Sequence, residues 1–305
     1  TWRHVAPGDR GKMLRRFAEV VASHKEELAQ LEIANSGHTR GNALWEVDNV
    51  VNVLTYYSAA PERLFGRQIP VAGGIDVTFK EPLGVVCVIV PWNFPMPIAG
   101  WGFAPALAAG NTLVLKPAEY TPLTAMKLGE YALEAGLPEG VFNVLAGKGS
   151  IIGARFVTHP QVRKIVFTGS TEVGKSIMAG CADQVKRVTL ELGGKSSNLI
   201  LADADIAKAA AAAPVSFLDN AGQDCCARSR ILIQKSAFDS FMEHFEVAVK
   251  NFRVEDPSLA SAEMGPLISR KQFDSVQTFL DEPVAFTGTA PTGSGYWMAP
   301  TVLLP

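Results

Sequence analysis

The sequence has few cysteines, and their arrangement excludes a disulfide scaffold. The four cysteines in 305 residues form no CxxC pair and no zinc-binding spacing. Two of them, Cys225 and Cys226, are adjacent and cannot easily form a disulfide with each other. A small secreted fold held by disulfides is therefore excluded, and a reducing, cytoplasmic setting is expected.

The sequence also lacks an excess of charge and a long apolar run. There are 28 basic and 30 acidic side chains, which gives a net charge of −2 and no basic field for a phosphate backbone, so no nucleic-acid partner is expected. The longest apolar run, 83–90, ends at Pro91 and is far shorter than the roughly 20 residues of a bilayer span, so no membrane insertion is expected. The five histidines lie outside every motif, so the sequence predicts neither a metal site nor a Ser-His triad.

The apolar residues that are present follow the spacings of both helices and strands. Segment 12–32 has helical spacing and predicts one amphipathic helix. Segment 75–80 alternates strictly between apolar and polar residues, which predicts a half-exposed strand. Segments 85–90 and 112–115 are unbroken, Val-rich runs, typical of parallel strands that are covered on both faces.

Further short strands are separated by helical stretches in the middle of the chain. They are predicted at 141–145, 164–168, 188–190, 198–201 and 231–233. This alternation favours right-handed βαβ crossovers and a doubly wound, mostly parallel, Rossmann-like α/β sheet. Ligands of such sheets bind at the carboxyl ends of the strands, which is where the motifs of this sequence fall.

Two glycine-rich turns follow predicted strands. The first, 147–153 (GKGSIIG), has one residue more than the usual dinucleotide fingerprint and also fits an ordinary tight turn. The second, 169–176 (GSTEVGKS), matches the phosphate-binding loop of nucleotide hydrolases, and 198–203 could supply their magnesium-binding Asp. In either interpretation backbone N–H groups face an anion at a helix N-terminus. A nucleotide hydrolase is therefore an alternative, although it leaves the other motifs unexplained.

Five motifs occur in a fixed order: 91–95 (PWNFP), 116–119 (KPAE), 167–171 (FTGST), 191–195 (ELGGK) and 220–225 (NAGQDC). Together they resemble the aldehyde dehydrogenase superfamily, and the resemblance extends over effectively the whole chain. It implies an enzyme that oxidises an aldehyde to a carboxylic acid with NAD through a covalent thioester.

The resemblance implies three catalytic residues. Cys225 is the implied nucleophile, because the GQxC spacing selects it over Cys226, and a helix N-terminus beside it would lower its pKa. Cys226 is expected to pack or to be a site of oxidative trapping. Asn93 is the implied donor to the oxyanion, together with the backbone N–H of Cys225. Glu191 is the implied base that activates water, which favours hydrolysis over transfer to coenzyme A.

The resemblance also implies a site for NAD. Lys116 and Glu119 are expected at the adenosine ribose, where a carboxylate repels a 2′-phosphate and favours NAD over NADP. Ser170 is expected at the pyrophosphate, with Gly174 allowing close helix packing and Lys175 exposed. The full set of expected cofactor-binding residues is Val90, Pro91, Trp92, Lys116, Glu119, Gly149, Phe167, Gly169, Ser170, Gly174, Leu192 and Gly193.

Three residues are expected to line the substrate tunnel: Phe94, Trp101 and Asp224. A carboxylate next to the nucleophile favours a cationic substrate such as an aminoaldehyde. Aromatic and aliphatic aldehydes stay open, as does a role for Asp224 as a helix cap.

The expected domains are a dinucleotide-binding domain over 1–63 and 83–192, a bridging arm over 64–82 and an incomplete catalytic domain over 193–305. Because members of the family continue at both ends, the chain is expected to be a fragment of a protein that forms a homo-oligomer, a dimer or a tetramer. The strand of the arm then lacks its partner and leaves an unpaired edge. A fragment without catalytic activity is the remaining alternative.

Overall fold

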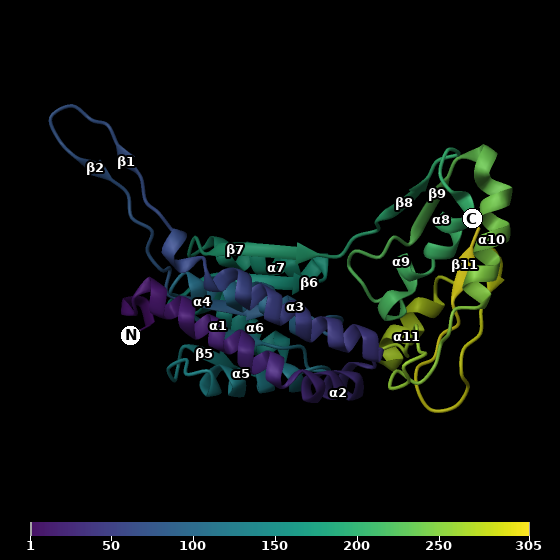
Figure 1. Cartoon of the computed structure of the whole chain (residues 1–305), viewed down its shortest axis with the longest axis horizontal. Helices are drawn as coiled ribbons and strands as arrows, with labels where there is room; N and C mark the ends of the chain where they lie inside the picture. The colour runs from purple at the N-terminus through teal and green to yellow at the C-terminus, as the bar shows by residue number, and fades with distance from the viewer. Residues whose placement is uncertain (1, 305) are drawn as a thin grey trace. The chain divides into compact units, whose positions relative to one another are not determined.

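The computed structural model describes residues 2–304, so Thr1 and Pro305, the outer limits of two expected domains, lie outside the described residues. The chain divides into two compact units, one formed by 1–28 and 44–192 and the other by 29–43 and 193–305. The sheet of the first unit is teal in Figure 1, and most of the second unit is green to yellow. Among residues 2–304, no helix combines the length and the apolar character that a membrane span needs.

The N-terminal part consists of three helices: α1 (Pro7–Ser23), α2 (Lys25–Ser36) and α3 (Arg40–Ser58). The single helix predicted over 12–32 was wrong, because the chain leaves the helical conformation at His24, whose φ is −100° and ψ is 18°. The predicted apolar face is nevertheless confirmed, since Leu14, Phe17 and Val21 are fully buried.

A sheet of parallel strands forms the centre of the first unit. Its order is β5-β4-β3-β6-β7, and its strands are β3 (Val85–Ile89), β4 (Thr112–Lys116), β5 (Phe142–Val144), β6 (Val162–Gly169) and β7 (Arg187–Leu192). The predicted doubly wound sheet is thus confirmed. The strand order reverses between β3 and β6, and ligands of such sheets bind in the crevice at this switch point.

Apolar cores cover both faces of this sheet. Val86 and Val88 belong to a core with α1, α3, α4 (Pro95–Ala108) and α5 (Leu123–Glu134). Cys87 and Ile89 face the other way, into a core with α6 (Gly149–Thr158) and α7 (Thr171–Ala182). Because successive side chains of a strand alternate between the faces, burial on both sides explains the unbroken apolar run of β3.

The segment expected to be a bridging arm is a short hairpin, labelled β1 and β2 in Figure 1. It pairs β1 (Gln68–Ile69) with β2 (Asp76–Val77) in antiparallel register. The prediction of a half-exposed strand over 75–80 was wrong on two counts: only two of its residues form a strand, and both faces are exposed. Ile75 and Phe79 are 88% and 80% exposed, so the rest of the described chain covers neither side chain.

The second unit has its own smaller sheets. The predicted strands at 198–201 and 231–233 are confirmed as the parallel pair β8 (Ser197–Ile200) and β9 (Arg230–Ile233), and β10 (Val284–Thr287) pairs with β11 (Thr301–Leu303). The helices are α8 (Ile206–Ala212), α9 (Val215–Leu218), α10 (Phe238–Lys250) and α11 (Arg270–Gln277). Phe241 and Phe245 of α10 anchor the apolar core. Beside that core lies a largely apolar cavity of about 480 Å³, which Ala221 and Gly222 also line.

Candidate active site

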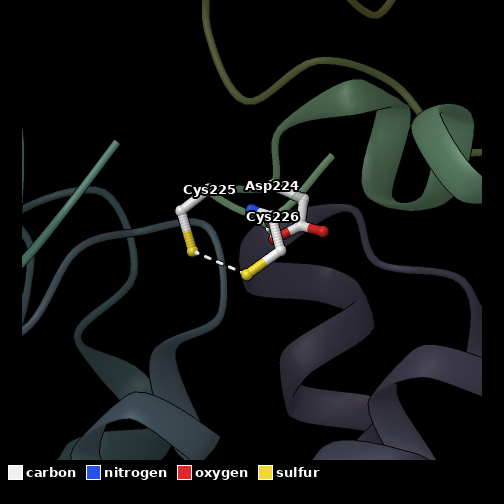
Figure 2. A group of neighbouring side chains, drawn as sticks. All are labelled: Asp224, Cys225 and Cys226. Atoms are coloured by element: carbon white, nitrogen blue, oxygen red, sulfur yellow. Dashed lines mark hydrogen bonds between the residues drawn. The ribbon is translucent and has the colours of Figure 1, made fainter. Parts of the chain in front are cut away.

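Cys225 lies in a turn between the 3-10 helix η3 (Asp219–Gly222) and β9. Cys225 is half-buried and Cys226 exposed, and their Sγ atoms are 3.7 Å apart and point toward one another (Figure 2). The expectation that a helix N-terminus lowers the pKa of Cys225 was wrong, because the residue lies in a turn. Its pKa is instead raised to about 12, first by burial, then by the hydrogen bond to Cys226 and by the charges of Cys226 and Asp224. Cys225 is therefore a thiol at neutral pH and needs a base to become a nucleophile.

The turn before Cys225 is built from consecutive left-handed residues. Asn220, Ala221 and Gly222 have φ values of 50°, 56° and 74°. Glycine adopts this conformation freely, whereas for Ala221 it costs roughly 1–2 kcal/mol. Strain of this kind persists only where surrounding contacts enforce it.

Gln223 provides such contacts from a buried position. Its Nε2 donates to the carbonyl oxygen of Asn220 (3.1 Å), and its Oε1 accepts the backbone N–H of Ile268 (3.0 Å). The Asn220 amide donates in turn to the Gln223 carbonyl at 3.4 Å. Asn220 and Gln223 thus position the cysteine turn, a role that the sequence analysis missed although both residues belong to the motif 220–225.

Asp224 stabilises the turn locally. Its Oδ1 accepts the backbone N–H of Cys226 at 3.0 Å, so the carboxylate lies beside the two thiols. The alternative that it caps a helix was wrong, since the next described element after this turn is strand β9.

The other motifs meet at the carboxyl edge of the sheet in the first unit. Asn93 lies in the connection between β3 and α4, and Glu191 is paired with Thr168 of β6 near the end of β7. Most of the remaining expected cofactor residues also lie at these strand ends: Val90, Pro91 and Trp92 after β3, Phe167 and Gly169 in β6, Leu192 at the end of β7 and Gly193 after it. The structure therefore brings the first four motifs to one edge of one sheet, while Cys225 belongs to the other unit.

Lys116, Glu119 and Gly149 form a small polar group at the end of β4. The Oε1 of Glu119 accepts the backbone N–H of Gly149, the first residue of α6, at 2.9 Å. Lys116 is buried and donates to the carbonyl of Pro117 (2.6 Å). Burial lowers the pKa of Lys116, and the charge of Glu119 opposes that shift. Glu119 itself stays exposed, where a hydroxyl-bearing ligand can reach it.

The second glycine turn forms the start of α7. Ser170 is its N-cap and accepts the backbone N–H of Val173 at 3.4 Å. A Cβ on Gly174 would lie 2.7 Å from the Leu192 side chain, so this glycine allows the helix to pack closely on β7. The exposed N-terminus of α7, next to the switch point, has the donors and the dipole that an anion requires.

The nucleotide-hydrolase alternative does not survive this geometry. The helix begins at Thr171, the third residue of the sequence that matches a phosphate-binding loop. Gly174 is buried against Leu192 instead of lying in a loop, and Lys175 is exposed on the helix as expected. No wide loop remains to surround a triphosphate.

Phe94 is the N-cap of α4, and Trp101 lies in the middle of this helix. Helix α3 adds Trp45, which the sequence analysis missed. The rings of Phe94 and Trp45 meet edge to face with centroids 6.3 Å apart. The Trp101 Nε1 donates to Asn49 Oδ1, one turn beyond Trp45 on α3, at 2.9 Å. Trp45 and Trp101 are each 49% exposed, so the group presents aromatic surface to solvent. Trp45 is identified only by its contact with Phe94, which is distant in the sequence.

Comparisons with known proteins identify the family of the chain. The profile of the Aldehyde dehydrogenase family matches residues 1–305. Aldehyde dehydrogenase family 2 member B4, mitochondrial, of Arabidopsis thaliana is 40% identical over 310 residues, which cover 99% of this chain and 58% of that protein. A crystal structure of betaine aldehyde dehydrogenase from Staphylococcus aureus with NAD+ matches with a TM-score of 0.95 and 36% identity, over 99% of this chain and 62% of that one.

An NADP-dependent enzyme of E. coli matches equally well in structure, with a TM-score of 0.95 and 34% identity, over 99% of this chain and 64% of that one. The chain thus spans about three fifths of the length of these relatives. The family predicted from the five motifs is confirmed: the chain belongs to the aldehyde dehydrogenase family.

Proposed function

We propose that the protein carrying this chain oxidises an aldehyde to a free carboxylic acid with NAD, using Cys225 as nucleophile, Asn93 as oxyanion donor and Glu191 as base. One observation carries the proposal beyond family membership: four of the five motifs lie at the carboxyl edge of a doubly wound sheet, two of them at the switch point between β3 and β6, where a dinucleotide is expected to bind. We propose that residues 1–63 and 83–192 bind the cofactor and that residues 193–305 provide the nucleophile, as expected from the sequence.

The residues at this edge fit the parts of NAD. The exposed carboxylate of Glu119, held in place by Gly149, suits the hydroxyls of the adenosine ribose. The N-terminus of α7, capped by Ser170, suits the pyrophosphate. Leu192 and Gly193, at the end of β7, are proposed to contact the nicotinamide. NAD, when bound, supplies a hydride acceptor. The carboxylate favours NAD over NADP, although the E. coli relative shows that the fold accommodates both cofactors.

The chemistry of the chain's own residues starts at Cys225. Because its pKa is raised, its thiol proton must pass to a base as sulfur attacks the aldehyde carbon and a C–S bond forms. The negative charge that develops on the aldehyde oxygen is stabilised by the Asn93 amide and the backbone N–H of Cys225. After oxidation the product is a thioester on Cys225. Glu191 takes a proton from the attacking water, and the C–S bond breaks to release the acid and the thiol.

For the substrate, we propose an aminoaldehyde in preference to a neutral aldehyde. Aromatic faces such as those of Trp45, Phe94 and Trp101 attract a cationic group, and the Asp224 carboxylate beside the thiol adds a negative charge. Replacing Asp224 by Asn keeps an acceptor for the Cys226 N–H but removes the charge. It is expected to raise the KM for an aminoaldehyde and to leave the KM for a neutral aldehyde of equal length unchanged.

We propose further that the protein is a homo-oligomer in a reducing, cytoplasmic setting. The exposed apolar residues of the β1–β2 hairpin support association between copies, and four free cysteines support the reducing setting.

The deciding experiment measures NADH formation from aldehyde in the natural protein that carries this sequence. Cys225→Ser is expected to abolish it, whereas the matched control Cys226→Ser keeps most of it. The reverse result would show that the nucleophile is misassigned. The non-catalytic alternative predicts that residues 1–305 by themselves bind nothing well, and micromolar binding of NAD by this fragment in isothermal titration would contradict it.

A further inference from the structure

We propose that the Cys225–Cys226 pair, together with the Asp224 carboxylate, is a binding site for Zn²⁺. Figure 2 shows the three side chains on one turn, with both sulfur atoms directed toward a common point. The inference concerns an inhibitory ion site and adds to the proposed oxidation, which needs no metal.

The spacing of the two sulfur atoms already fits the ion. Zn²⁺ binds thiolate sulfur at about 2.3 Å in a tetrahedral site, so two thiolates on one ion lie about 3.8 Å apart. The Sγ atoms of Cys225 and Cys226 are 3.7 Å apart. A disulfide would instead need a separation of about 2.05 Å and a large change in this turn. The two sulfur atoms, which share a hydrogen bond in this turn, thus lie at the separation of two thiolates on one ion.

Asp224 supplies a third ligand from the same turn. One ligand atom from each of Asp224, Cys225 and Cys226 lies within 4.8 Å of the other two. The hydrogen bond from the Cys226 N–H holds the Asp224 carboxylate on the side of the thiols. Three protein ligands with a water molecule in fourth position form a common arrangement for accessible zinc.

The ligand set also selects the type of ion. Two sulfur atoms and a single carboxylate suit a soft or borderline ion such as Zn²⁺, whereas Mg²⁺ and Ca²⁺ require oxygen ligands. On binding, each thiol releases its proton to solvent and two Zn–S bonds form. No electron is transferred, so the step requires no oxidant.

Access to the site is open. Cys226 is exposed and Cys225 is half-buried in the turn, so an ion from solvent reaches both. If Cys225 is the nucleophile of the proposed function, a bound ion occupies its sulfur and blocks attack on the aldehyde. This consequence rests on the proposed function, whereas binding itself does not.

The test uses Co²⁺ as a spectroscopic substitute for Zn²⁺ in the natural protein, reduced and kept under argon. We expect a thiolate-to-cobalt charge-transfer band with the intense visible bands of a tetrahedral site, and loss of both when one equivalent of Zn²⁺ is added. Cobalt bands without thiolate charge transfer would overturn the proposal.

Variants locate the ion. Cys226→Ser is expected to weaken Zn²⁺ binding more than about 100-fold, since even residues that only support metal ligands contribute 10–100-fold. Asp224→Asn weakens it less. The control is Cys181→Ala, which removes a buried cysteine elsewhere and keeps the affinity unchanged. Circular dichroism shows whether each variant is folded. Equal affinity of folded wild-type and Cys226→Ser proteins would contradict the site.

The rate of NADH formation gives a second test that does not depend on the cobalt spectra. Zn²⁺ is expected to inhibit NADH formation, and a chelator without affinity for thiols restores it. Restoration by a thiol reductant that does not bind Zn²⁺ would point to oxidation of the pair and overturn the proposal. If no aldehyde is oxidised at all, the proposed function fails while the cobalt and affinity measurements still decide the ion site.

Discussion

At the scale of single residues, surroundings and not residue type determine how the four cysteines react. Burial raises the pKa of Cys87 to about 12 and also raises that of Cys181. Cys225 is shifted to a similar value, but its shift depends partly on the neighbouring Cys226 and Asp224. Cys226 is the exposed member of the group.

These differences predict a labelling pattern. In native protein at pH 8, iodoacetamide is expected to modify Cys226 and Cys225 and to leave Cys87 and Cys181 unmodified, because the last two are sealed in the core. Labelling of Cys225 rises about tenfold per pH unit between pH 7 and 9 without a plateau, because its thiolate fraction grows at that rate below its pKa. Peptide mass spectrometry measures each site separately.

Cys226→Ser supplies the matched control for this pattern. Removing the thiol removes two of the causes that raise the pKa of Cys225, so Cys225 is expected to be labelled faster in the variant at the same pH. Slower labelling would show that Cys226 activates its neighbour.

Glu119 carries a second prediction at this scale. Glu119→Gln keeps an acceptor for the Gly149 N–H but removes the charge that, in the proposed function, repels a 2′-phosphate. The KM for NADP is expected to fall at least tenfold, with a smaller change for NAD, in steady-state assays of the natural protein. An unchanged ratio of the two KM values would remove Glu119 as the discriminating residue.

Local motifs in the sequence identify candidate residues, but they do not identify residues that act through contacts across the fold. Glu119, Ser170 and Gly174 follow strands and begin or support helices, so their neighbours in the sequence identify them. Gln223 acts through Ile268, 45 positions along the chain, and Trp45 acts through a contact between two helices. No pattern in the sequence encodes those pairs.

At the scale of elements, strands with two covered faces were predicted well, because their Val-rich runs reflect burial directly. The helix over 12–32 and the strand over 75–80 were predicted less well. His24 ends one helix and precedes another without a Gly or Pro to announce the break. The alternation of apolar and polar residues in 75–80 predicts an extended chain. It does not show whether another element packs against that chain.

The packing of α7 on β7 makes Gly174 a sensitive position. Gly174→Ala places a methyl group 2.7 Å from Leu192, so we expect a loss of about 1–3 kcal/mol in unfolding free energy. Urea denaturation followed by circular dichroism measures this loss. The control Gly41→Ala, in α3 with nothing within 4 Å of the new methyl group, is expected to be neutral or stabilising.

At the scale of the whole molecule, the β1–β2 hairpin and the residues beside it expose several large apolar side chains. Phe65, Ile75 and Phe79 are 74–88% exposed, more than an isolated chain normally tolerates so close together. Replacing 66–80 by a short Gly-Ser linker is expected to lower the oligomeric state, measured by light scattering after size exclusion. The replacement leaves the central sheet intact, since neither strand of the hairpin pairs with it. An unchanged mass would exclude the hairpin from the interface.

The left-handed turn at Asn220, Ala221 and Gly222 has a consequence for heating. It stores conformational free energy, and two of its residues, Ala221 and Gly222, line a cavity instead of packed core. This turn is therefore expected to loosen at a temperature at which the central sheet is still intact. The half-buried thiol of Cys225 then becomes fully accessible in a molecule whose secondary structure is unchanged, so the proposed chemistry should be lost at a lower temperature than the fold.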